Sequence, residues 1–215
     1  MNKKFNLNKQ IKITLLAAMA FILMYFDFPL PLFPGFLKID LSDLPALIGA
    51  FALGPVEGIA IELLKNILHV LFKGTQTALV GEMANFIVGS VLVFISGYMY
   101  KRNKNKSGAI IGLVSGVLVM TAVAALINYF ILIPTYAKVF KLPLEAIIAM
   151  GTKLNGNIVD LRSLIIWSIV PFNLLKGILV SLVTLGVYKN VSLLIHKEEV
   201  IVKDVRKKKY SKENV

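Results

Sequence analysis

Residues 108–133 read GAIIGLVSGVLVMTAVAALINYFILI, a stretch of 26 residues without a charged side chain. An α-helix rises about 1.5 Å per residue, so roughly 20 apolar residues cross the hydrocarbon core of a bilayer. The whole chain agrees with this stretch, since 57% of its 215 residues are hydrophobic, 17% are charged and the mean hydropathy is +0.75. Such values lie outside the range of water-soluble domains. The sequence therefore predicts a membrane protein.

Other apolar segments flank this stretch, and with it they predict an all-α fold with six transmembrane helices. The predicted spans are residues 11–28, 44–53, 54–72, 80–100, 108–133 and 164–188. The first follows a basic N-terminus but lacks a small-residue cleavage site, so we interpret it as a retained span and not as a signal peptide. Pro134 is expected to end the fifth span. The predicted organisation is an N-terminal tail over 1–12, a membrane domain over 13–188 and a basic tail over 189–215.

The basic residues indicate how the chain is oriented. Four Lys or Arg residues lie in 1–12, four in 101–106 and eight after Tyr188, whereas the loops 29–43, 73–79 and 134–163 together hold six. Cytoplasmic loops carry the excess of Lys and Arg, so both termini are predicted to be cytoplasmic. The net charge of +12 flanks apolar segments instead of forming one basic face, which favours the lipid bilayer over nucleic acid as the partner.

Several chemistries are excluded or disfavoured. The chain has no Cys, which excludes disulfides, zinc-thiolate sites and thiol catalysis. It has no GxxxxGK[ST] motif, so any energy that its function requires must come from a partner or an ion gradient. A metal site built on Glu62 and His69 lacks further ligands, and an enzyme would have only His69 and His196 as histidine bases. A stand-alone carrier is compatible with these exclusions, with Glu57, Glu62 or Glu82 as its proton relay.

Ionisable residues inside predicted spans are functional candidates because they are costly in a membrane. They are Asp27, Glu57, Glu62, Lys65, Glu82 and Lys176. Glu62, Lys65, Asn66 and His69 are spaced three and four apart, so they share one helix face. A buried ion pair with flanking hydrogen bonds is the simplest interpretation of that face.

Polar residues near the predicted outer ends of spans suggest a binding pocket. Asn128 lies late in the fifth span, and Asn173 and Lys176 lie early in the sixth. An amide offers donors and an acceptor, which suits a heterocycle edge with an N–H beside a carbonyl, while lysine donates to oxygens. Helix-to-helix hydrogen bonding is the alternative for all three. Glu82 and Asn85 lie in the first turns of the fourth span, where capping and pocket roles both fit.

The loop before the second span carries Asp40, Ser42 and Asp43. These side chains could cap the helix that follows or belong to a gate over the pocket, and the pattern alone leaves both roles open.

Five segments resemble the riboflavin-specific S components of energy-coupling factor transporters, in the same order along the chain. They are FLKIDLSDLPALIGAFALGP (36–55), IELLKNILHVLFKGT (61–75), GEMANFIVG (81–89), AALINYFILIPTY (124–136) and PFNLLKG (171–177), and the resemblance covers roughly residues 14–182. S components for other vitamins share the architecture with different pocket residues, so another vitamin remains an alternative.

The resemblance implies a six-helix protein that captures riboflavin near the extracytoplasmic side of the cell membrane. It would associate with a membrane coupling subunit and two ATPase subunits, perform no catalysis and hold no cofactor, because the flavin is the transported ligand. The long first loop would cover the pocket and contribute Leu37, Lys38 and Asp40. Asn128 would face the flavin ring edge, and Asn173 and Lys176 the ring or the ribityl chain. The predicted substrate-binding residues are therefore Leu37, Lys38, Asp40, Glu82, Asn85, Asn128, Asn173 and Lys176.

The resemblance also implies a docking face for the coupling subunit on the first helix, built from small residues. Thr14, Ala17 and Ala18 supply them, although a strict Ala-xxx-Ala pair is absent and Thr14 to Ala18 is the nearest equivalent. Small side chains allow close helix approach, which is what such docking needs.

Overall fold

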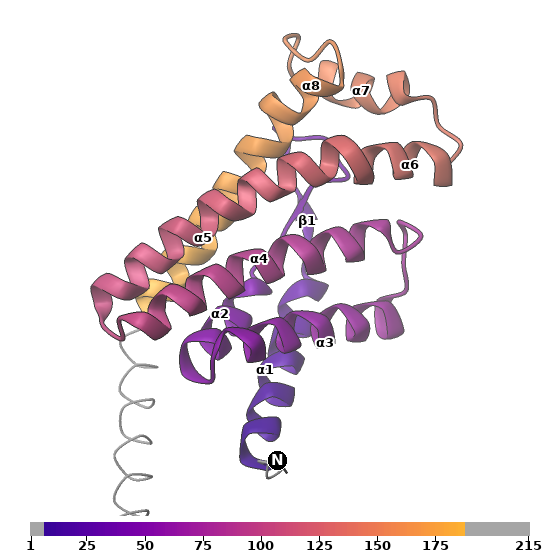
Figure 1. Ribbon diagram of the computed structural model, residues 1–215. Coiled ribbons are helices and arrows are strands. Elements are labelled where there is room, and N and C mark those ends of the chain that lie inside the picture. The colour runs from indigo at the N-terminus through magenta and orange to yellow at the C-terminus, as the bar shows by residue number, and fades with distance from the viewer. Residues whose placement is uncertain (1–6, 188–215) are drawn as a thin grey trace, which may run out of the picture.

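The structure is a computed structural model that describes residues 7–187, and these residues are mostly helical (Figure 1). The helical elements are α1 (Leu7–Tyr25), α2 (Asp43–Ala52), α3 (Pro55–Lys73), α4 (Val80–Arg102), α5 (Lys106–Ile127), the π-helical η1 (Asn128–Leu132), α6 (Ile133–Val139), α7 (Leu144–Thr152), α8 (Leu161–Leu164) and the π-helical η2 (Ile165–Ile169). The last helix runs without interruption over Leu161–Val187. The basic tail predicted for 189–215 lies outside the described residues.

One feature departs from the all-α prediction. The first loop contains two short strands, β1 (Phe28–Pro29) and β2 (Lys38–Ile39), which pair antiparallel with Phe28 opposite Ile39 and Pro29 opposite Lys38. This pairing folds the loop back on itself beside the helices.

Four of the described helices are long and apolar enough to cross a membrane: Leu7–Tyr25, Val80–Arg102, Lys106–Val139 and Leu161–Val187. α2 has only 10 residues, and α3 carries Glu57, Glu62, Lys65 and Lys73 along its 19 residues. Length and apolarity therefore support a membrane protein, while the count of six spans stays a prediction.

Two predicted span ends differ from the structure. The first helix ends at Tyr25, so Asp27 lies in the loop after the helix and not inside a span. Pro134 does not end the fifth span, because the helix continues to Val139. The prediction that Pro134 ends the fifth span was wrong, because the turn before this proline is a wider π turn.

Both long helices near the C-terminal end pass a proline by widening one turn. In η1 the N–H of Ile133 donates to Asn128 O, and in η2 the N–H of Val170 donates to Ile165 O, so each bond spans five residues. Pro134 and Pro171 follow these turns directly. A proline lacks an N–H and its ring collides with the preceding turn, so a wider π turn lets the helix continue. η1 and η2 contact each other, which brings the two widened turns together.

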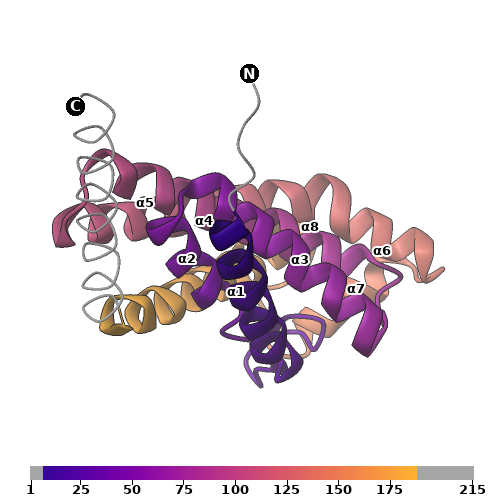
Figure 2. The same ribbon diagram turned by 90° about the horizontal axis from the view of Figure 1, so that it is seen from below.

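The helices pack around a core of small and branched residues. α1 lies against α2 and α3, and α4 lies between α3 and α5 (Figure 2). α4 and α5 approach so closely that a Cβ at Gly112 would lie 2.7 Å from the Ser96 carbonyl oxygen. Such backbone contact is typical of helix pairs in membranes, where small residues provide the packing surface. The bundle leaves one end open between α3, α4 and the α6–α7 segment.

Candidate functional site

The open end of the bundle contains a cavity of about 410 Å³, and a second cavity of about 130 Å³ adjoins it. Both are lined by Phe36, Lys38, Gly81, Asn85, Asn128 and Tyr136, so they form one continuous site. No side chain of the described residues groups with others into a three-ligand metal cluster. The volume and the lining of the two cavities are those of a small-molecule pocket.

The larger cavity has two unlike walls. One wall, from the end of α1 through β2, α3 and the start of α4, is largely polar, although Met24 of α1 also lines it; its polar side chains are Asp27, Lys38, Asp40, His69, Lys73, Gln76, Thr77 and Glu82. The other wall, from α6, α7 and the turn between them, is largely apolar: Ile133, Tyr136, Phe140, Leu142, Ile147 and Met150. A ligand with one flat apolar part and one hydroxylated part matches such a division.

The first loop lies against this site and is held there by several contacts. The Phe33 ring packs edge-on against Phe172 with centroids 5.4 Å apart. Asp27 lies 2.5 Å from Lys73 Nζ and 3.3 Å from Lys38 Nζ, which joins the end of α1 to the end of α3 and to β2. Partial burial alone would raise the pKa of Asp27, but the hydrogen bonds and charges of both lysines outweigh it and hold that pKa below its ordinary value.

A chain of buried charges lies behind the smaller cavity. Lys176 Nζ is 3.1 Å from Asp40 Oδ2 and 3.4 Å from Asp43 Oδ2. Lys65 Nζ contacts Asp43 Oδ1 and lies 2.7 Å from Glu62 Oε2. Three carboxylates thus alternate with two lysines, and Glu62 and Lys65 are fully buried. The ion pair predicted between Glu62 and Lys65 is confirmed, and Asp43 and Lys176 extend it to two further helices.

Three polar residues that were candidates for helix caps have other partners. Ser42 precedes α2 but makes no side-chain capping bond; its Oγ accepts from Lys65 Nζ at 2.8 Å. Asp40 Oδ1 accepts from the Ser42 N–H at 2.8 Å. Glu82 accepts from the hydroxyls of Thr75 at 3.0 Å and Thr77 at 2.6 Å. These contacts hold the carboxylates at the site instead of closing helix ends.

The two asparagines of the predicted pocket bond within their own helices. Asn128 Nδ2 donates to Ala124 O at 2.8 Å, and Asn173 Nδ2 donates to Ile169 O at 2.8 Å. In residues 7–187 neither amide hydrogen-bonds to another helix, so helix-to-helix bonding does not account for them. Each amide lines the site, and its oxygen and its second N–H have no hydrogen-bond partner among the described residues.

Comparison with known proteins identifies the family. Residues 8–188 match the family described as ECF transporter, substrate-specific component. The chain belongs to that family. It is a membrane protein, in agreement with its four long apolar helices.

Relatives of this substrate-specific component include riboflavin transporters. It is 36% identical to the riboflavin transporter RibU of Staphylococcus aureus (strain TCH60), over 89% of this chain and 97% of the relative. It is 32% identical to the riboflavin transporter FmnP of Bacillus subtilis (strain 168), over 81% and 87%. A solved structure of the S component of a bacterial ECF transporter matches with a TM-score of 0.68 and 32% identity, over 87% of this chain and 97% of that one.

All eight predicted substrate-binding residues of this S component line the site. Asp40 and Glu82 line the larger cavity. Leu37, Asn173 and Lys176 line the smaller one. The remaining three line both: Lys38, Asn85 and Asn128. The residues converge from the first loop, α4, η1 and the last helix, although their binding role stays a prediction.

The sequence prediction missed some residues of the site. His69 was assigned to the charged face of the third span, but it lies one turn beyond Lys65, where that face opens into the cavity. Phe36 and Tyr136 line both cavities, and nothing in their local pattern distinguishes them from other apolar residues. Asp43 was considered only for capping or gating, and its pairing with two lysines depends on tertiary contacts.

The three predicted docking residues differ in their exposure. Ala17 is 1% exposed and belongs to the hydrophobic core, because it faces inward from α1. Thr14 is exposed and Ala18 is partly exposed. Of the three, Thr14 and Ala18 are the residues that a docked helix could reach, and the docking role itself stays a prediction.

The buried charges make Lys65 a sensitive position. Lys65→Met leaves Asp43 and Glu62 buried beside each other without their shared cation, so we expect a loss of about 3 to 5 kcal/mol in the free energy of unfolding. Lys9→Met provides the control, because Lys9 pairs with Glu57 at a partly exposed position and should cost less than about 1 kcal/mol. Unfolding of the purified protein in SDS, followed by circular dichroism, measures both. Equal losses would show that the buried network adds nothing beyond a surface pair.

Proposed function

We propose that this protein captures riboflavin at the extracytoplasmic face of the cell membrane and delivers it for ATP-driven import by partner subunits. The observation that carries the proposal is the division of the larger cavity into an apolar and a polar wall, in a chain whose named relatives are riboflavin transporters. Riboflavin combines a flat aromatic ring with a hydroxylated ribityl chain, which matches both walls. The protein would perform no catalysis and hold no cofactor, since the flavin is its cargo.

The proposed contacts follow from the site. Asn128 would meet the donor and acceptor edge of the ring, because its free amide groups offer the complementary set. Asn173 and Lys176 would bind the ring or the ribityl oxygens from the last helix. The remaining contacts come from the covering loop and the start of α4: Leu37, Lys38, Asp40, Glu82 and Asn85.

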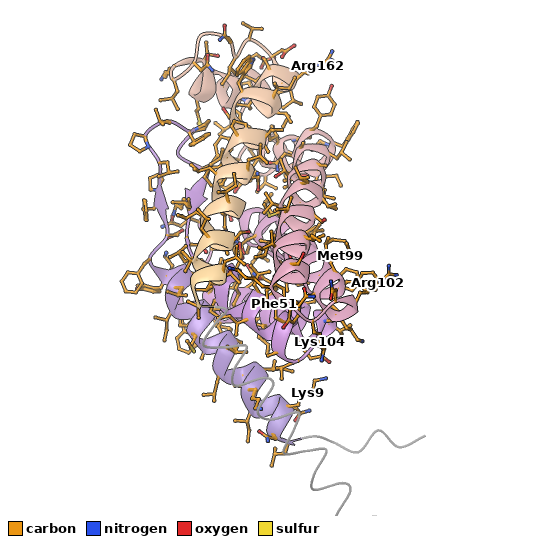
Figure 3. All side chains as sticks on the ribbon, turned by 90° about the vertical axis from the view of Figure 1, so that its left-hand side faces the viewer. Lys9, Phe51, Met99, Arg102, Lys104 and Arg162 are labelled. Atoms are coloured by element: carbon orange, nitrogen blue, oxygen red, sulfur yellow. The ribbon has the colours of Figure 1, made fainter. Side chains whose placement is uncertain are left out.

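The proposed topology has six membrane spans with both termini in the cytoplasm. Lys9, Arg102 and Lys104 lie toward one end of the molecule and Arg162 at the other (Figure 3), in support of a basic cytoplasmic end. α3 can serve as a span despite its charges, because Glu62 and Lys65 are fully buried while Leu63, Ile67 and Leu71 are exposed. α2 would then be a short inward-running span covered by α1, α3 and α4.

The proposed partners are a membrane coupling subunit and two ATPase subunits, with Thr14 and Ala18 in the docking face. A stand-alone proton carrier is less well supported, because each of its three candidate proton-relay carboxylates already pairs with a different group. Glu57 pairs with Lys9, Glu62 with Lys65, and Glu82 with two threonine hydroxyls.

Riboflavin should bind far more tightly than thiamine or biotin. Neither of those vitamins has both a broad tricyclic ring and a hydroxylated chain to match the two walls. Titrating riboflavin into the purified protein and following the quenching of flavin fluorescence measures affinity, and the visible spectrum of the purified protein reports any co-purified flavin. Competition by thiamine or biotin at concentrations equal to riboflavin would contradict the assignment.

Substitution of the cavity amides and the lysine should weaken binding. Asn128→Ala, Asn173→Ala and Lys176→Ala each remove a partner from a buried polar group of the ligand, at a cost of about 1 to 3 kcal/mol or roughly 5-fold to 150-fold in affinity. Fluorescence titration of each folded variant tests this. Unchanged affinity in all three would mean that these side chains serve only the packing of the helices.

Ala18→Trp should separate capture from coupling. Ala18 lies six residues before Met24, the α1 residue that lines the cavity, which is about 9 Å along the helix. The bulky ring should therefore spare riboflavin binding but force a docked helix away and abolish ATP-driven uptake. Met19→Trp is the matched control, because Met19 is a large exposed residue of the same helix that lies about 100° around the helix from Ala18. Loss of binding together with uptake would show that the docking face has been misplaced.

A further inference from the structure

His69 differs from the other polar side chains on its helix face. It is 8% exposed and lies near the C-terminal end of α3, where its ring lines the larger cavity. Neither Nδ1 nor Nε2 hydrogen-bonds to any residue in 7–187. By contrast, Lys65 pairs with two carboxylates, and Asn66 Nδ2 donates to Glu62 O at 2.8 Å. Buried polar atoms of proteins nearly always have a partner. Other buried atoms among the described residues also lack one, such as Asn66 Oδ1 and Ser96 Oγ, but of these side chains only His69 lines the larger cavity, so a group bound in that cavity is its candidate partner.

The other buried or charged side chains of the polar wall around His69 already have partners. Asp40 and Glu82 are the other buried polar side chains of the larger cavity, and both already accept hydrogen bonds. Lys38 and Lys73 are both paired with Asp27. Within the described part of this wall, His69 is thus the buried side chain whose hydrogen-bonding capacity is unused.

We propose that His69 is a specificity-determining residue that hydrogen-bonds a hydroxyl group of the ligand's polyhydroxylated chain. This inference rests on the proposed function, because it assumes a ligand with a ring on the apolar wall and a hydroxylated chain on the polar one. A neutral imidazole has one donor and one acceptor nitrogen, and a hydroxyl can both donate and accept. A hydroxyl can therefore hydrogen-bond to His69 in either tautomer. A carbonyl of the ligand's ring can bond only to the protonated imidazole nitrogen, and an N–H of the ligand's ring only to the unprotonated one.

The test compares two flavins that differ only in the chain. Riboflavin carries the ribityl group, whereas lumiflavin has the same ring with a methyl group in its place. His69→Phe keeps a planar ring in the cavity wall and removes both nitrogens, and His69→Gln restores a donor and an acceptor. Affinities for both flavins are measured by fluorescence titration of wild type and variants, with Asn128→Ala as the control for a ring contact. The thermal midpoint of each variant reports on folding.

His69→Phe should weaken riboflavin binding by roughly 5-fold to 150-fold and leave lumiflavin binding within about twofold. His69→Gln should recover part of the riboflavin affinity, and Asn128→Ala should weaken both flavins alike. Unchanged riboflavin affinity, or an equal loss for both flavins, overturns the role assigned to His69. If His69→Phe does not fold, His69→Leu is read by the same criteria. A wild-type protein that binds neither flavin would instead overturn the proposed function itself.

Discussion

The buried chain of charges from Asp40 through Lys176, Asp43 and Lys65 to Glu62 is the constraint on which the rest of the structure depends. A charge removed from water is tolerated only where an opposite charge meets it, so each ion pair sets the position of the helix that carries it. Lys65 holds α3 to α2, and Lys176 holds the last helix to α2 and to the first loop. The covering loop is thereby anchored through Asp40 to the last helix, which lines the smaller cavity.

The two π turns are the second structural feature that determines the shape of the site. They allow Pro134 and Pro171 to lie inside long helices, and η1 and η2 meet where the two helices approach the cavity. Asn128 is the first residue of η1, and Asn173 bonds to Ile169, the last residue of η2. π turns occur often at functional sites because they reorient the side chains beside them. Here they aim two amides into one cavity from two different helices.

The arrangement separates ligand capture from the supply of energy. The polar and apolar walls lie at one end of the bundle, while the small exposed residues of α1 lie further along the helix, toward the end that carries Lys9, Arg102 and Lys104 (Figure 3). The chain has no phosphate-binding loop. Membership in the family of substrate-specific components accounts for this division, because such a component needs a binding site and a docking face but no nucleotide site of its own.

The sequence by itself determined the membrane class, most of the helix positions and a set of pocket residues, because these follow from local patterns and from family segments. Apolar length predicts a span, and a spacing of three residues predicts that Glu62 and Lys65 meet. Only the tertiary structure decided that Asp40 reaches Lys176 from 136 residues away, that Ala17 faces the core and that His69 opens into the cavity. It also showed that the helix continues past Pro134. The reason is that helical periodicity orders residues within one helix, whereas the rotation of each helix toward its neighbours depends on packing of the whole bundle.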